Sequence, residues 1–565
     1  MCGIFFTTIK DKIHDEVFEK IKKTVSDRGP DKLLHFNDKK FEALMSVLSI
    51  TRDKKKEIKK SEFITSKNKI ILFNGEIYNW LYLKNKFKVS GFSDTEVLSQ
   101  ILDQINLENL APLINGMFSI LVVSSDEVEL ITDPRGEKRL FYFFKDNQLT
   151  ISSELKNILL TSDKLKANLN KDKILEYLST RHFLTYEKTI FNDINVTIPG
   201  SYIKFNFNKS PYRIVKKNLI NYEQNLNLKQ ENFDIKYLIE SFRNVANLLT
   251  PNVPYCSVAS GGIDSTLATY YLMRTKTPPN FTIGLSFKGS DEHTKRVNEL
   301  LKNLVPHKIF EVSLDDFAEN LDSTINRLCH PLPTHSFTSQ LMLAKFAKAE
   351  GAKVIIGGDG GDEFFGGYEL YKKMDISNSL KYSVSPYSSY DEKFLRKLGL
   401  KGSSHNRLFY NNLWTKTLEK WNMTIGKGTD AIYKAAFDLD QTLQLSSTGF
   451  YASDIMTSSV GIEGRNFYAN QLITNLTKTY PLYKLLDLEN NITRPFIKKV
   501  FYKNFSRNEF TKQGFSGYPN EAGHILLKDQ KFEYVSDYLE IIIDKDFNRS
   551  EEWKLINLEL FLRNL

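Results

Sequence analysis

The sequence has few cysteines and no long apolar run. Its three cysteines, Cys2, Cys256 and Cys329, show neither the pattern of a disulfide framework nor the close spacing of a metal site. No apolar run approaches the length that spans a bilayer, and the N-terminus lacks a charged-then-apolar signal. These absences argue against a disulfide-stapled secreted domain and against a membrane-spanning protein. They predict a cytoplasmic protein without a membrane partner.

A strong excess of one charge is also missing. The 565 residues include 77 Lys and Arg against 68 Asp and Glu, a formal net charge of +9. The basic run 54–60 contains no interleaved aromatic residue, so we interpret it as a solvated loop and predict no nucleic-acid partner. The chain shows neither an internal repeat nor a low-complexity tract, and its length suits two to four domains.

What the sequence does contain begins at position 2. Removal of Met1 would leave a thiol and a free α-amine on one residue, Cys2. A terminal amine has a pKa of about 8, so part of it is unprotonated near neutral pH. The amine can take the thiol proton directly or through a water molecule, which gives a nucleophile and a base within one residue.

Two further segments contain groups that an acyl-transfer site needs. The apolar run 70–73 predicts a strand that ends at Asn74-Gly75, where a side-chain amide and an unhindered N–H could hold an oxyanion. The alternative is an ordinary Asn-Gly turn. Asp94 opens a helical pattern, and there it could instead be a helix cap.

These segments together resemble the class II glutamine amidotransferase domain, which hydrolyses glutamine with an N-terminal cysteine. The resemblance implies that Cys2 is nucleophile and base, that Asn74 and Gly75 form the oxyanion hole, and that Glu76 and Asp94 hold the glutamine amino group. It also implies an Ntn-hydrolase-like sandwich of antiparallel sheets with flanking helices over 1–165. The matching segments are 2–4, 28–31, 74–79, 93–96, 116–118, 133–138 and 152–156.

A second chemical site follows the short apolar run 254–259. The segment 260–265 reads Ser-Gly-Gly-Ile-Asp-Ser and leads into a helical pattern. A strand, a glycine turn and a helix start present free N–H groups and the positive end of a helix dipole to a phosphate. Ser260 and Ser265 add hydroxyl donors, and Asp264 can hold Mg²⁺ against the phosphates. The alternative is a structural glycine turn, and the Walker motif is absent.

A second glycine-rich segment lies further along the chain. The apolar run 353–356 predicts a buried strand, and the segment 357–368 that follows it contains six glycines together with Asp359, Asp362 and Glu363. Six glycines at a strand end disfavour folding because glycine loses more conformational freedom than any other residue. We therefore interpret the segment as a functional loop.

The segment 260–265 resembles the pyrophosphate loop of ATP pyrophosphatases, and the two sites in this order resemble glutamine-hydrolysing asparagine synthetases over about residues 1–525. The resemblance implies that Asp264 and Asp362 bind magnesium pyrophosphate and that Asp359 lies near an acyl-adenylate. Lys512 matches a lysine that stabilises phosphate charge, unless it is an ordinary surface residue. The further ATP-binding residues implied are Val258, Ser260, Gly261, Gly262, Ser265, Ile283, Gly357 and Gly358.

The same resemblance implies the organisation of the rest of the chain. A doubly wound parallel-sheet domain of the ATP pyrophosphatase (adenine nucleotide α-hydrolase-like) type is expected over 251–525. Residues 166–250 are expected to be a linker that leads into it, and 526–565 a helical tail of unassigned role. The fold class is thus α/β combined with α+β, in two domains, and a homodimer is allowed for.

The implied activity is asparagine synthesis with ATP and Mg²⁺ as cofactors. Glutamine, aspartate and ATP would give asparagine, glutamate, AMP and pyrophosphate, with ammonia passing between the sites through a shielded passage. Two alternatives stay open: another carboxylate acceptor, such as a sugar acid, a peptide or a natural-product intermediate, and an ammonia-dependent form with a weak glutaminase. A β-lactam-type ring-closing synthetase would leave Cys2 idle, and intact motifs disfavour a non-catalytic scaffold.

One position departs from the pattern of the family that the chain resembles. In the segment aligned with 45–50, the third residue is normally an arginine that binds the α-carboxylate of glutamine, whereas here it is Val47. Three interpretations follow. Arg52 could take the place of the missing arginine, glutamine could bind weakly, or the amide donor could lack that carboxylate.

Overall fold

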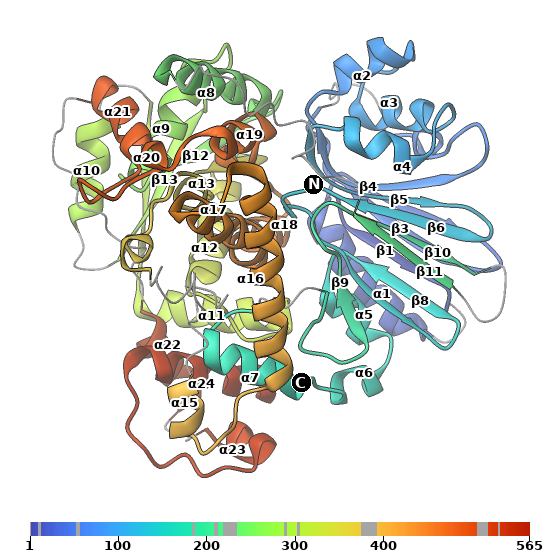
Figure 1. Cartoon of the computed structure of the whole chain (residues 1–565). Coiled ribbons are helices and arrows are strands. Elements are labelled where there is room, and N and C mark those ends of the chain that lie inside the picture. The colour runs from blue at the N-terminus through green and yellow to red at the C-terminus, as the bar shows by residue number, and fades with distance from the viewer. Residues whose placement is uncertain are drawn as a thin grey trace.

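The computed structural model describes residues 2–9, 13–51, 57–183, 187–207, 213–218, 234–287, 291–301, 305–374, 392–505, 518–528 and 532–565. Two halves lie side by side, with antiparallel sheets on the right of Figure 1 and a sheet covered by helices on the left. The N-terminus lies at the junction between the two halves (Figure 1), so any chemistry at Cys2 takes place close to both of them.

Two antiparallel sheets form the N-terminal half. One has the strand order β2-β3-β1-β8-β7-β9 and the other has the order β11-β10-β6-β5-β4. Apolar side chains of both sheets, among them Phe6, Phe73 and Leu121, meet in one core, as in a β-sandwich. The strands are β1 (Ile4–Thr7), β2 (Lys32–Asn37), β3 (Glu42–Val47), β4 (Ile70–Ile77), β5 (Gly116–Val123), β6 (Glu127–Thr132), β7 (Phe141–Lys145), β8 (Gln148–Ser152), β9 (Ile194–Val196), β10 (Ser201–Asn206) and β11 (Arg213–Asn218). The helices of this part are α1 (Asp15–Arg28), α2 (Trp80–Phe87), α3 (Asp94–Ile101), α4 (Leu107–Leu110), α5 (Leu155–Leu160) and α6 (Asp163–Ala167). Helix α7 (Lys171–Thr180) follows them along the chain but packs against helices of the C-terminal half (Figure 1).

A five-stranded parallel sheet organises the C-terminal half. Its strands lie in the order β14-β13-β12-β15-β16, and all are parallel. Successive strands of the chain are added on one side of β12 as far as β14 and on its other side from β15, so the strand order reverses between β12 and β15. In doubly wound sheets of this kind, ligands bind at the carboxyl ends of the strands beside that reversal. The predicted fold class is therefore confirmed for both halves. The strands are β12 (Tyr255–Val258), β13 (Phe281–Phe287), β14 (His307–Val312), β15 (Val354–Gly357), β16 (Glu463–Asn466), β17 (Leu486–Asp487) and β18 (Ile492–Thr493).

The helices of the C-terminal half cover both faces of the sheet (Figure 1), which explains why its strands are almost continuously apolar. They are α8 (Ile235–Leu249), α9 (Ile263–Leu272), α10 (Asp291–Leu301), α11 (Leu314–Leu328), α12 (Ser336–Ala349), α13 (Gly361–Phe365), α15 (Glu392–Lys397), α16 (Ser404–Ile425), α17 (Thr429–Leu439), α18 (Gly449–Ser458), α19 (Gln471–Thr479), α20 (Leu482–Leu485), α21 (Pro495–Asn504), α22 (Pro519–Leu527), α23 (Glu533–Leu539) and α24 (Arg549–Arg563).

One predicted strand end is wrong. Strand β4 does not stop before Asn74 but continues to Ile77, and Asn74 and Gly75 pair in register with β5. Gly75 has φ 133°, and a Cβ atom on it would lie 1.9 Å from the carbonyl oxygen of Met117. The glycine is therefore required by close packing inside the sheet rather than by a turn.

The segment that we expected to link the halves contains strands of the N-terminal sheets. Strand β9 pairs with β7, and β10 pairs with β6 and β11. Helix α8, by contrast, packs its apolar face against α9 in the core of the C-terminal half. We therefore propose that the domain boundary lies between Asn218 and Ile235.

The end of the chain is an integral part of the C-terminal half. Helix α24 is buried along most of its length and packs against α22, α23 and α11.

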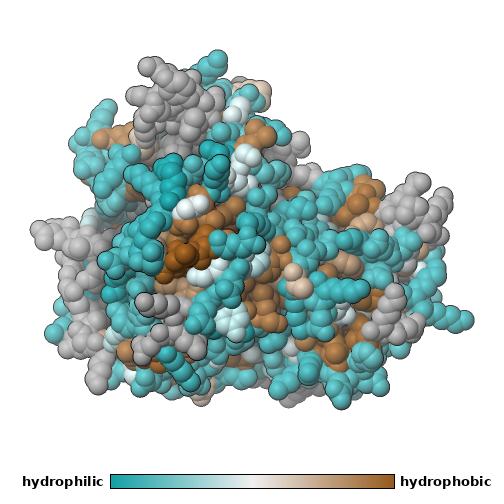
Figure 2. Space-filling model, turned by 90° about the horizontal axis from the view of Figure 1, so that it is seen from below, coloured by the Kyte–Doolittle hydropathy of each residue, from teal (hydrophilic) through white to brown (hydrophobic). Residues whose placement is uncertain are grey.

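Figure 2 shows the face seen from below, where an apolar patch on the left is bordered by hydrophilic residues. Within the described ranges, no helix has both the length and the apolar character to cross a membrane.

Candidate active sites

The first candidate site surrounds Cys2 at the start of β1. The backbone N–H of Cys2 donates to Asn74 Oδ1 at 3.0 Å, and Arg28 Nε donates to the Cys2 carbonyl oxygen at 3.3 Å. The side chain is 8% exposed, and burial raises the pKa of its thiol. The thiol is consequently protonated near neutral pH, and a base must remove its proton before it can attack.

The orientation of the Asn74 amide follows from its contact with Cys2. While Met1 is present, the Cys2 nitrogen is a peptide N–H that can only donate, so the atom of Asn74 that faces it is the acceptor Oδ1. The amide nitrogen Nδ2 is then buried without a hydrogen-bond partner in the described part of the chain. A buried donor without a partner is unfavourable on its own, and it suits an oxygen that becomes negative only during a reaction.

Two predicted glutamine-binding carboxylates lie beside Cys2 and already have partners. Asp94 accepts hydrogen bonds from the N–H groups of Thr95 (2.8 Å) and Ile77 (3.2 Å), while Ser93 caps helix α3 and so frees Asp94 from that role. Glu76 pairs with Arg465 of the other half at 2.9 Å. Burial raises the pKa of both carboxyls, that of Glu76 to about 8.

The cavity at Cys2 is small and acidic. Its volume is about 40 Å³, which is enough for a group of a few heavy atoms. Val47 lies on its wall, whereas Arg52 falls outside the described residues. None of the described residues on the wall is a lysine, arginine or histidine. The ionisable wall residues other than Cys2 are Glu62, Glu76 and Asp94.

The second candidate site is a cavity of about 390 Å³ at the carboxyl ends of β12 and β15, where the strand order reverses. This volume is in the range of small-molecule sites. The predicted residues that line it are Val258, Ser260, Gly262, Asp264, Ser265, Gly357, Gly358, Asp359 and Asp362. Gly261 and Ile283 do not line it. Ile283 is buried in β13, where it lies beside Val258 of β12. Lys512 lies outside the described residues.

Glycines allow the two loops of this cavity to touch. A Cβ atom on Gly358 would lie 2.9 Å from the backbone nitrogen of Ser265, and one on Gly361 would lie 2.5 Å from the Asp264 carboxyl carbon. Both distances are shorter than real Cβ contacts, so larger residues would push the loops apart. The close approach of the two loops thereby explains Gly358 and Gly361.

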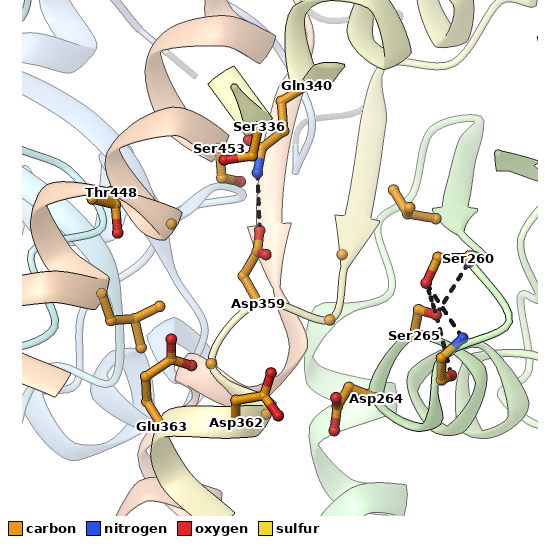
Figure 3. A pocket seen from close by; sticks show the side chains of 18 of the residues that line it. Ser260, Asp264, Ser265, Ser336, Gln340, Asp359, Asp362, Glu363, Thr448 and Ser453 are labelled. Atoms are coloured by element: carbon orange, nitrogen blue, oxygen red, sulfur yellow. Dashed lines mark hydrogen bonds between the residues drawn. The ribbon is translucent and has the colours of Figure 1, made fainter. Parts of the chain in front are cut away.

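Asp264 and Asp362 point toward each other across the cavity (Figure 3) and share one cation. Arg494 Nη1 lies 2.6 Å from Asp264 Oδ2 and 3.0 Å from Asp362 Oδ1. Two carboxylates that converge on one positive charge fit a magnesium ion, which in nucleotide sites uses one or two carboxylates together with substrate phosphates. No cluster of three or more metal-binding side chains is found among the described residues, so phosphate oxygens would complete the coordination.

Asp359 lies above this pair in Figure 3. Burial raises its pKa to about 6, and Gln340 Nε2 donates to its Oδ2 at 3.3 Å. Burial also raises the pKa of the neighbouring Glu363 to about 8. The prediction from sequence missed Gln340 and the wall residues Thr448 and Ser453, because isolated polar residues on helices give no signal of function.

Comparisons with known proteins match a different family model to each half of the chain. A family model described as a glutamine amidotransferase domain matches residues 1–214, and one described as asparagine synthase matches residues 242–561. The chain belongs to the asparagine synthase family. Membership makes it an ATP-dependent ligase that uses glutamine as its nitrogen donor, while the acceptor is not specified.

The relatives in this family have low sequence identity to the chain. The putative asparagine synthetase [glutamine-hydrolyzing] 2 of Methanocaldococcus jannaschii is 26% identical, over 71% of this chain and 80% of that protein. The asparagine synthetase [glutamine-hydrolyzing] 1 of Bacillus subtilis is 26% identical, over 66% of this chain and 60% of that one. The amidase chyE of Penicillium rubens is 25% identical, over 53% of this chain and 47% of that protein.

Buried ion pairs join the two halves of this asparagine synthase family member beside Cys2. Arg28, which is fully buried and contacts the Cys2 carbonyl, pairs with Asp454 of helix α18 at 2.8 Å. Lys138 pairs with the other oxygen of Asp454 at 2.9 Å. Helix α18 also carries Ser453 and Thr457, which line the second cavity. One helix therefore lines the second cavity and reaches Cys2 of the first site through Arg28.

Proposed function

We propose that the chain is a glutamine-dependent asparagine synthetase. The observation that carries the proposal is the pairing of two sites in one chain. Cys2 faces an Asn74 amide whose Nδ2 lacks a partner among the described residues, and the large cavity brings Asp264 and Asp362 together. A glutaminase alone would not need the second cavity, and an adenylating enzyme alone would not need the first.

In the first site, the Cys2 thiol would attack the side-chain amide of glutamine after its own α-amine has taken the thiol proton. The carbon–nitrogen bond breaks, a thioester remains on the enzyme and ammonia leaves. Asn74 Nδ2 and the N–H of Gly75 would stabilise the oxyanion, and Asp94 with Glu76 would hold the glutamine amino group. Water then hydrolyses the thioester to glutamate.

In the second site, the loop 260–265 would bind the ATP phosphates with its N–H groups and with the hydroxyls of Ser260 and Ser265. Asp264 and Asp362 would hold Mg²⁺, which neutralises phosphate charge when bound. The acceptor carboxylate attacks the α-phosphorus and pyrophosphate leaves. Ammonia from the first site then attacks the acyl carbon near Asp359, and AMP leaves. Lys512 stays a candidate for stabilising the phosphate charge.

A second candidate acceptor is a carboxylate other than aspartate. The observation that favours it is that some relatives are named amidases rather than asparagine synthetases, in Penicillium rubens and in Gibberella zeae. The same two half-reactions would serve either acceptor, because the adenylation step needs only a carboxylate within reach of the α-phosphorus.

The experiment that separates these acceptors is a screen of carboxylic acids for AMP release, with ATP, Mg²⁺ and ammonium chloride. The proposal expects aspartate to give the highest kcat/KM and asparagine as the product. If another acid supports AMP release and aspartate does not, the assignment as an asparagine synthetase is wrong. If the protein is folded and none of the tested acids leads to AMP release, the adenylation reaction itself is refuted.

A further inference from the structure

A second, smaller cavity lies against the synthetase cavity, where the two halves meet. Its volume is about 40 Å³, which is enough for a group of a few heavy atoms. Its wall combines residues of strand β7, the segment 188–196 and helix α18. The polar and aromatic wall residues are Arg139, Phe141, Phe183, Lys188, Thr189, His330, Ser447 and Tyr451.

Arg139 has no anionic partner in this cavity. Over the described ranges, its guanidinium forms neither an ion pair nor a hydrogen bond, and its Nε atom is buried without an acceptor. Its one polar contact is with the ring of Tyr451, whose centroid lies 5.6 Å from Cζ. The Tyr451 hydroxyl is likewise buried without a hydrogen-bond partner in the described structure. Two donors without a hydrogen-bond partner among the described residues therefore lie on the wall of one small cavity.

The remaining wall residues make this space positive. Lys188 adds a second cation, and no aspartate or glutamate is among the described residues on the wall. His330 contributes no charge, because burial lowers its pKa to about 4 and its Nδ1 donates to the Pro331 carbonyl at 2.8 Å. Burial lowers the pKa of Arg139 to about 10, so the guanidinium remains charged at neutral pH. An unpaired cation in a partly buried site is unfavourable until an anion joins it.

Two segments of the chain connect this space to the synthetase cavity. His330 lines the small cavity, while Thr334 and Ser336, a few residues later, line the large one. Ser447 lines the small cavity, while Thr448 lines the large one. Two separate segments thus contribute to both walls, and the cavities are neighbours around the start of helix α18.

We infer that the small cavity binds a second carboxylate of the acceptor acid, held by Arg139 and the Tyr451 hydroxyl. This inference rests on the proposed function and narrows its acceptor to a diacid, whose first carboxylate is adenylated in the large cavity. A guanidinium and a hydroxyl are donors that match carboxylate oxygens. Aspartate meets the requirement with its α-carboxylate, and so would a larger diacid.

The test compares pairs of acceptors that differ only in the second carboxylate. Aspartate and 3-aminopropanoate form one pair, and any diacid active in the screen forms another with its decarboxylated analogue. In ammonia-driven AMP release, Arg139→Gln should raise the KM of the diacid at least tenfold and the KM of the monoacid less than twofold. Arg139→Lys should fall between wild type and Arg139→Gln. Equal changes for the two members of a pair would overturn the inference.

A matched control and a binding measurement complete the test. Arg243→Gln, on the exposed face of α8, should leave both KM values at the wild-type level. Malonate should raise the melting temperature of wild type and not that of Arg139→Gln or Tyr451→Phe. If no acid releases AMP, the proposed function fails, but the malonate result still decides the anion site. Equal stabilisation of all variants by malonate would reject it, as would a large loss of stability in Arg139→Gln without malonate, which would show a structural role.

Discussion

The two candidate active sites differ in how far each depends on the other half of the molecule. The synthetase cavity is about 390 Å³, and every described residue on its wall comes from the C-terminal half. The cavity at Cys2 is about 40 Å³, and its surroundings include Arg465 and, through Arg28, Asp454 of the other half. The first site is therefore completed by the interface. The wall of the large synthetase cavity comes from one half alone, and Arg139 of the N-terminal half lies in the small cavity beside it.

This difference predicts which changes affect one reaction and which affect both. Changes inside the synthetase cavity should leave glutamine hydrolysis intact, because that cavity takes no residue from the N-terminal half. Changes at Cys2 should leave ammonia-driven synthesis intact, because Cys2 does not line the synthetase cavity. The following experiments test these expectations, beginning with the largest effect.

Replacing Cys2 by alanine should have the largest effect. The variant loses the only nucleophile proposed for glutamine, so glutamine-driven synthesis should fall by about a thousandfold or more. Ammonia-driven synthesis should stay within about twofold of wild type, because the synthetase cavity is unchanged. Both rates can be measured as AMP release with the best acceptor acid. A parallel loss of both activities in a folded variant would contradict the separation of the sites.

Asp264→Asn and Asp362→Asn should each lower AMP formation by about a hundredfold or more. Each change removes one of two carboxylates that converge on a single cation, and metal-assisted charge stabilisation contributes several kcal/mol. Glutamine hydrolysis should remain measurable in both variants. Asp315→Asn, an exposed aspartate on α11, provides the matched control and should leave AMP formation unchanged. An equal loss of glutaminase activity would show that the halves do not act separately.

Asp359→Asn should make the protein more stable at neutral pH while it impairs synthesis. The folded pKa is about 6 against about 3.9 for an unfolded aspartate, so folding opposes ionisation. Above pH 6 the carboxyl is charged in both states and its burial costs about 3 kcal/mol; below pH 4 it is neutral in both states and the cost disappears. The melting temperature of the variant should therefore exceed that of wild type at pH 7, and the difference should shrink between pH 6 and pH 4. A lower melting temperature at pH 7 would show that the charge is stabilising.

Val47→Arg should produce the smallest of these effects, a decrease of about tenfold in the glutamine KM. A charge-assisted bond to the α-carboxylate contributes about 1.5–3 kcal/mol, and the wall at Val47 has no cation among its described residues. Val47→Leu serves as the control for side-chain volume and should leave the KM unchanged. Arg52→Ala tests the substitute-arginine interpretation, which fails if this variant keeps the wild-type KM.

The local parts of both sites were predictable from the sequence. Cys2, the Asp94 helix start and the segment 260–265 depend on which residues adjoin each other along the chain, and the structure forms the expected strand, loop and helix there. The prediction was wrong at the end of β4, because close packing of Gly75 against Met117 extends the strand. A dipeptide typical of turns could not reveal that contact.

The sequence by itself determined the two kinds of chemistry, their order along the chain and the fold class of each half, because short motifs indicate the chemistry and their resemblance to a known family implies the folds. Only the tertiary structure decided that Arg494 pairs with Asp264, 230 positions away, and that Arg465 pairs with Glu76 across the interface. It alone also left Arg139 without an anion beside Tyr451 in the described structure. The physical reason is that charge pairing depends on distance in space, and that distance is set by packing between elements far apart in the sequence.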